Sequence, residues 1–114
     1  MTLVDLTARD RETVRRCIAA MAFGPFLDDA EFRTRIGIDR RGVASLLAAW
    51  PQLDDKDDHS DISLALNNCM NEVCHGVPIP DSDWGFWFDR PRIEVLEVFE
   101  NWCRSRGWGS SGVR

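Results

Sequence analysis

The chain has 114 residues, enough for one domain with a buried core and too few for two. Apolar residues make up 44% of it and charged residues 29%, a balance that excludes a largely disordered protein. The formal net charge of −5 argues against nucleic acid as a direct ligand, because phosphate binding needs clustered Lys and Arg. We therefore expect a single domain over 1–114, with a flexible tail at 107–114.

The chain lacks the signals of membrane insertion and export. No apolar run approaches the roughly 18–20 residues that cross a bilayer. The start, MTLVDLTARDRE, has neither the basic region nor the apolar region of a secretory signal. The four cysteines lie beside apolar residues in helical patterns. We expect a cytoplasmic protein with no membrane partner, whose cysteines are reduced core thiols.

Five segments show helical spacing and none shows convincing strand alternation, which predicts an all-α fold, a single compact bundle of about five helices. The first helix is expected over 7–22, with Thr7 as its N-cap. The second is expected over 28–36, with acids in its first turn and Gly37 at the C′ position.

Three further helices follow in chain order. One is expected over 39–50, where Pro51 stops it. The next is expected to be capped by Ser60 or Asp61 and to end near His75, and the last runs from 89 to just before 107. The residues expected to face the core repeat at helical spacing. They are Val14, Cys17, Ile18, Met21, Phe32, Ile36, Val43, Leu46, Leu47, Trp50, Ile62, Leu66, Cys69, Met70, Val73, Ile93, Leu96, Phe99, Trp102 and Cys103.

Between the last two helices lies VPIPDSDWGFWFD, which we predict to be one long aromatic-rich loop over 77–89. Loops of that length are uncommon in compact domains unless they are functional or pinned by their own side chains. Trp84, Phe86, Trp87 and Phe88 are the side chains available for pinning.

Negative charge is concentrated in the middle of the chain. Residues 54–100 hold twelve carboxylates against three bases, whereas 1–53 is nearly balanced and the last fourteen residues carry arginines and no acid. Such a polarised field attracts partners of opposite charge. The acidic balance indicates either a basic protein partner or a role in solubility alone, and solubility is the commoner role of acidic residues.

The densest acidic run, DDKDDHSD at 54–61, has three interpretations. As a cation site it lacks the glycine and the distal glutamate of an EF-hand loop. It can be a solvated linker, or it can form a partner-binding patch with the acids and tryptophans of 81–87, since aromatic anchors ringed by charge are common in interfaces. Against the last interpretation, both tryptophans can instead be core residues. The candidate partner-binding residues are Asp54, Asp55, Asp57, Asp58, Asp61, Asp81, Asp83, Trp84 and Trp87.

The second and third helices also have the outline of a helix-turn-helix around Gly37. Arg40, Arg41 and Ser45 would then be placed to read DNA. Two arginines supply little of the phosphate attraction that binding needs, so an ordinary αα-corner is the better interpretation. A transcriptional or nucleoprotein module stays as the alternative function.

Cys69, Cys74 and His75 are a second grouping that suggests metal chemistry, and they also suggest thiol chemistry. On a helix, the side chains at positions 69 and 74 point about 140° apart, so the two thiols cannot coordinate the same ion. Cys74 and His75 are neighbours in sequence and do not face each other as a nucleophile and its base must. We therefore expect no metal, no cofactor and no enzymatic activity.

Three stretches carry a resemblance: GPFLDDAEFRTRIGIDRRGVASLLAAWP, LALNNCMNEVCHG and WGFWFDRPRIEVLEVFENW. They are similar to a small acidic uncharacterised bacterial family that resembles toxin immunity proteins of the contact-dependent growth inhibition type. The match spans about 6–102, and its shared motifs name no chemistry. The resemblance implies a protein that binds a cognate toxin domain, often a basic nuclease, and blocks its active site or an adjoining surface.

Overall fold

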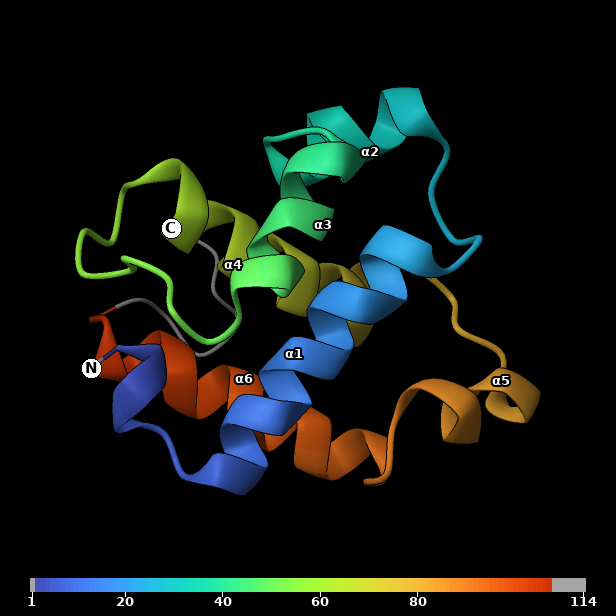
Figure 1. The fold of residues 1–114 in the computed structure, drawn as a ribbon. Coiled ribbons are helices and arrows are strands. Elements are labelled where there is room, and N and C mark those ends of the chain that lie inside the picture. Colours follow the sequence, from blue (N-terminus) through green and yellow to red (C-terminus); the bar gives the residue numbers. More distant parts are fainter. Residues whose placement is uncertain (1, 108–114) are drawn as a thin grey trace.

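The computed structural model describes residues 2–107, and every regular element in that part of the chain is helical (Figure 1). The elements are the 3₁₀ turn η1 (Leu3–Asp5), the α-helices α1 (Ala8–Phe23), α2 (Asp29–Ile36), α3 (Arg40–Ala49), α4 (Asp61–Asn71), α5 (Asp81–Trp87) and α6 (Arg92–Ser105), and the π-helical turn η2 (Glu72–Gly76). The all-α prediction is confirmed. The flexible tail predicted at 107–114 lies outside the described residues, apart from Gly107 in a turn.

Local capping sets where the first four helices begin. Their N-caps are Thr7, Asp28, Asp39 and Ser60, and each side-chain oxygen accepts the N–H of the residue three positions on. These bonds satisfy backbone donors that have no partner inside the helix. α2 ends at Gly37, whose φ of 103° lies in the left-handed region, as expected for a glycine at C′.

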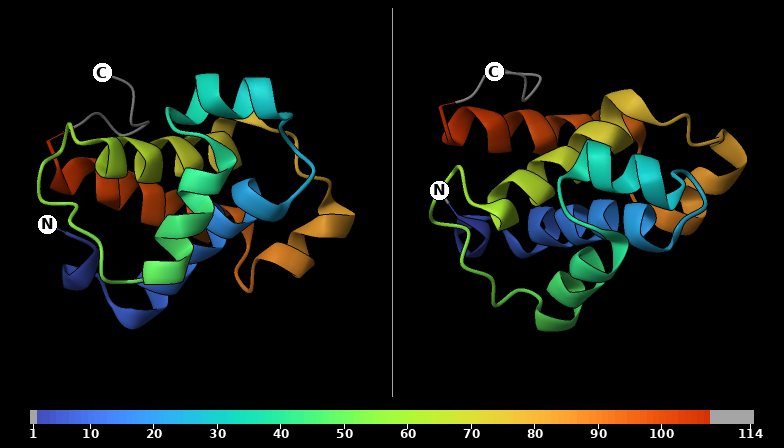
Figure 2. Two further views of the ribbon diagram at one scale, coloured as in Figure 1. Left: turned by 45° about the horizontal axis from the view of Figure 1, so that its top comes forward. Right: turned by 90° about the horizontal axis from the view of Figure 1, so that it is seen from above.

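α1 runs through the middle of the molecule and contacts α3, α4, α5 and α6 (Figures 1 and 2). The core therefore forms around its apolar face. The largest fully buried side chains include Val14, Ile18, Met21, Phe32, Leu66, Phe99 and Trp102. Within the described residues, no helix has both the length and the apolar character needed to span a membrane.

One residue of the predicted core faces solvent instead. Ile93 is 60% exposed, because α6 turns Val95, Val98 and Trp102 inward and leaves Ile93 on its flank. Several others are only partly buried and pack against the edge of the core, namely Leu46, Leu47, Trp50 and Ile62. Leu96 is also only partly buried. The apolar stripe of α6 is therefore wider than its core face.

The predicted loop at 77–89 is also wrong in part, because its second half is helix α5. The Pro80 carbonyl accepts the N–H groups of Asp83 and Trp84, which starts the helix. Asp81 and Asp83 stand in its first turn, where negative charge favours the helix dipole. α6 then begins at Arg92, three residues later than predicted.

Gly24 should tolerate no side chain, whereas Gly85 should. A Cβ at residue 24 would overlap the carbonyl oxygen of Ala20 and lie 2.5 Å from the Phe26 ring. We expect Gly24→Ala to lower the free energy of unfolding by about 1–3 kcal/mol. Gly85→Ala, on α5, meets no atom within 4 Å and should raise it by about 0.5–1 kcal/mol. Urea denaturation measures both values, and equal effects of the two substitutions would contradict this account.

Candidate functional site

The structure does not bring the predicted partner-binding residues together on one surface. The linker 54–61 lies at the left of Figure 1 and α5 at the right, and both views in Figure 2 keep them at opposite ends of the molecule. The acids of the linker and the residues of α5 must therefore be considered as two separate regions.

Asp55, predicted on the binding surface, is buried instead. Its side chain is 4% exposed, and Arg106, with a side chain 1% exposed, holds it through an Nη2–Oδ2 contact of 2.8 Å. Asp55 Oδ2 also accepts the N–H of Leu3 at 2.8 Å. Arg106 forms a second ion pair with Asp58 at 2.8 Å and stacks over the Trp102 ring. We call this group the Asp55 clasp; it ties the N-terminus, the linker and the end of α6 together.

The other linker acids remain on the surface. Asp54, Asp57 and Asp61 are exposed, and none of them forms an ion pair with another described residue. The side chains of Asp54 and Asp57 each accept the N–H two positions on, which holds the linker in local turns. Asp61 opens α4. We call these three residues the linker surface.

Trp84 on α5 is held by several contacts and is only partly exposed. Its ring stacks on Phe88 with 4.2 Å between centroids, and its Nε1–H donates to the carbonyl of Arg90 at 2.7 Å. The guanidinium of Arg92 lies 4.3 Å from the centre of the indole, and Arg92 also forms an ion pair with Asp81 at 2.9 Å. Trp84 is therefore a fixed wall between α5 and α6.

Trp87 and Phe86 form the outer end of α5. The Trp87 ring meets Phe26 edge to face at 6.1 Å, which packs it against the molecule. Phe86 contacts Trp87 at 4.8 Å between centroids but is itself 77% exposed. Asp83, on the same helix, forms no ion pair with another described residue. Of the aromatic residues on α5, Phe86 is thus the one turned to solvent, and the sequence analysis left it out of the candidate site.

Internal ion pairs neutralise charge unevenly along the chain. Most of the described arginines pair with carboxylates: Arg9, Arg15, Arg16, Arg35, Arg40, Arg90, Arg92 and Arg106. Within 54–100, the carboxylates that have no such partner among the described residues are Asp54, Asp57, Asp61, Asp83, Asp89, Glu97 and Glu100. Lys56 likewise forms no ion pair within the part of the chain that the structure describes. The uncompensated charge of this half therefore stays negative.

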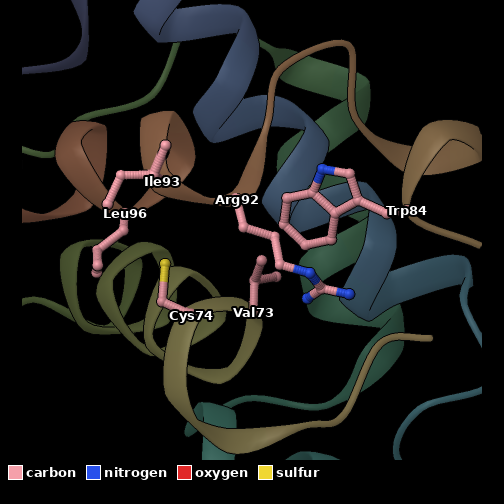
Figure 3. Close-up of a pocket in the computed structure, with 6 residues that line it drawn as sticks. All are labelled: Val73, Cys74, Trp84, Arg92, Ile93 and Leu96. Atoms are coloured by element: carbon pink, nitrogen blue, oxygen red, sulfur yellow. The ribbon is translucent and has the colours of Figure 1, made fainter. Parts of the chain in front are cut away.

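A pocket of about 290 Å³ lies between η2, α5 and α6 (Figure 3). Its lining is mostly apolar, with one guanidinium at the side of Trp84. The lining residues are Val73, Cys74, Trp84, Arg92, Ile93 and Leu96. Ile93 and Leu96, predicted to face the core, line this pocket instead. In the sequence, an apolar stripe on α6 wider than one core face indicates a second apolar surface.

The cysteines are placed for packing. Cys17 and Cys69 are buried, and burial raises the pKa of both thiols. Burial also raises the pKa of Cys74 to about 12, with contributions from Cys103 and Glu100. These thiols are protonated at neutral pH and are weak nucleophiles. Among the described residues, no cluster of three or more His, Cys, Asp or Glu is arranged to hold a metal ion.

Arg40, proposed above as a DNA reader, points into the protein. Its Nη1 donates to the carbonyls of Met21 at 3.0 Å and Ala22 at 3.1 Å, and its guanidinium lies over the Phe32 ring. It therefore joins the end of α1 to α2 and α3. Of the three residues that a helix-turn-helix would use, Arg41 and Ser45 remain exposed, whereas Arg40 is engaged inside the fold.

Comparisons with protein-family models, curated protein sequences and solved structures found no match to this chain.

Proposed function

We propose that this chain is a cytoplasmic immunity protein, which binds and neutralises a cognate bacterial toxin domain of basic charge. The observation that supports the proposal is the negative charge left on 54–100 after the internal ion pairs are formed. It is exposed at the linker surface, where Asp54, Asp57 and Asp61 form no ion pair with another described residue. Burial raises the pKa of the Cys17, Cys69 and Cys74 thiols, so these three are weak nucleophiles at neutral pH, which agrees with a binding role.

The linker surface suits a nuclease as the partner. An enzyme that holds a polyanionic substrate lines its cleft with Lys and Arg, and an acidic surface of another protein can occupy that cleft. Charge complementarity of this kind speeds association by about 10- to 1000-fold and makes it sensitive to salt. The Asp55 clasp holds the linker against α6, so these acids are presented on an ordered segment.

Neutralising the linker surface should slow binding of the toxin domain. The test searches the genes neighbouring this one for a basic toxin domain, which is co-expressed with the chain to score growth and purified for association kinetics. We expect the wild-type chain to restore growth. The variant Asp54→Asn/Asp57→Asn/Asp61→Asn should associate at least tenfold more slowly at low ionic strength, with a flatter dependence on salt.

A matched control adds the same net charge elsewhere. Ala30→Lys/Thr34→Lys/Ala48→Lys changes exposed positions on α2 and α3 and raises the net charge by the same amount. At about 0.1 M salt, where the Debye length is about 10 Å, it should keep the association rate within about threefold of the wild-type value, because charges farther than this from the contact are screened. Equal rates for the wild type and the linker variant, or equal losses in both variants, would overturn the role of the linker surface. Failure of the wild-type chain to restore growth would overturn the immunity function.

A further inference from the structure

The pocket between η2, α5 and α6, which we call the α5–α6 pocket, has walls that are fixed before any ligand binds. Trp84 is held by its stack on Phe88 and by its bond to the Arg90 carbonyl, so the indole wall is not free to collapse. Val73 and Cys74 supply another wall from η2 (Figure 3). π-helical turns such as η2 recur at functional sites. A preformed pocket of this kind lowers the entropic cost of binding.

The pocket is open to solvent through apolar side chains. Ile93 is 60% exposed although it belongs to the apolar stripe of α6, and Leu96 is only partly buried beside it. The volume of about 290 Å³ lies just below the range of about 300–1,000 Å³ typical of small-molecule sites. The size therefore suits one side chain of a partner better than a cofactor.

The charge around the pocket selects the kind of partner. Glu97 lies one helical turn after Ile93, and Glu100 lies one turn after Leu96, so both carboxylates flank the lining residues of α6. Neither forms an ion pair with another described residue, whereas the lining cation Arg92 is paired with Asp81. Glu100 is also near enough to contribute to the raised pKa of Cys74. The surroundings are thus negative and disfavour an anionic lipid or carboxylate ligand.

We propose that this pocket receives an aliphatic or aromatic side chain from a basic segment of a partner protein, with Lys or Arg beside it meeting Glu97 and Glu100. The inference rests on the proposed function and adds a second contact region, at the end of the molecule away from the linker surface. Interface energy concentrates where an apolar anchor fills such a pocket and charges surround it. The pocket supplies the slow dissociation that surface charge alone does not.

Synthetic peptides test the pocket without the toxin domain. The probes are Lys-Arg-Lys-Leu-Lys-Arg-Lys and the same peptide with a central Ser, titrated into the full chain while the methyl NMR signals of Val73, Ile93 and Leu96 are followed. We expect the Leu peptide to shift these methyls in a saturable manner and to bind at least fivefold more tightly than the Ser peptide. Equal affinity of the two peptides, or unmoved pocket methyls at 5 mM peptide, would overturn the proposal.

Two exposed apolar residues give a matched pair of variants. Ile93→Lys places a cation at the mouth of the pocket and should reduce the affinity for the Leu peptide at least tenfold. Val4→Lys, at a residue 63% exposed on η1, makes the same kind of change away from the pocket and should leave it unchanged. Equal losses in both variants would contradict the site. The peptide titration and the growth test are independent. If the peptides do not bind but the chain still restores growth, only the pocket proposal is refuted. If the chain does not restore growth, the immunity function is refuted.

Discussion

Replacing Arg106 with Ala is expected to lower the free energy of unfolding by about 3–5 kcal/mol. The substitution leaves the buried Asp55 carboxylate with the Leu3 N–H but without its cationic partner, and breaking a buried ion pair in this way is strongly destabilising. It also removes the second ion pair, to Asp58, and the contact over the Trp102 ring. Urea denaturation followed by circular dichroism measures the change.

Arg104 is the control for this prediction. It lies in the last turn of α6, two residues before Arg106, is exposed, and contacts Asn101 one turn earlier. Arg104→Ala should change stability by no more than about 0.5 kcal/mol. A loss at Arg106 no larger than the loss at Arg104 would mean that the Asp55 clasp does not hold the fold together. Loosening the clasp also frees the linker, so Arg106→Ala should weaken toxin binding even where the chain stays folded.

Trp84→Ala is expected to lower the free energy of unfolding by about 3 kcal/mol, near the bottom of the range for a large aromatic residue in a core because Trp84 is only half-buried. The substitution removes the stack on Phe88, the hydrogen bond to the Arg90 carbonyl and the surface on which Arg92 lies. It leaves the pocket without one wall, so the Leu peptide should bind no better than the Ser peptide.

Phe86 provides the comparison on the same helix. Its ring is 77% exposed, so Phe86→Ala should alter stability by less than about 0.5 kcal/mol and leave the pocket intact. Thermal or urea unfolding of the two variants separates a structural tryptophan from a surface aromatic. If Trp84→Ala were as mild as Phe86→Ala, the indole would be a surface residue and the fixed wall of the pocket would not exist.

Helix positions followed from local chemistry. Thr7, Asp28 and Asp39 begin helices because their own side chains satisfy a backbone N–H three residues on, and Gly37 ends one because it adopts a positive φ. Such interactions span a few residues, so the pattern of side chains is enough to predict them. Helix α5 was not predicted, because Pro80, Gly85 and four aromatic residues have low helix propensity. The helix forms because Trp84 and Trp87 pack against the core.

The sequence by itself determined that the chain is helical and where its first four helices begin. It also determined that the carboxylates are concentrated in one half of the chain. Each of these features depends on composition or on residues close together in the sequence. Only the tertiary structure decided which acids are available to a partner. Asp55 is the same residue type as Asp54 and Asp57, yet it is buried because Arg106, 51 positions away, reaches it across the fold. Likewise Ile93 belongs to an apolar stripe but lines a pocket, because the packing of α6 against α1 and α4 left that flank uncovered.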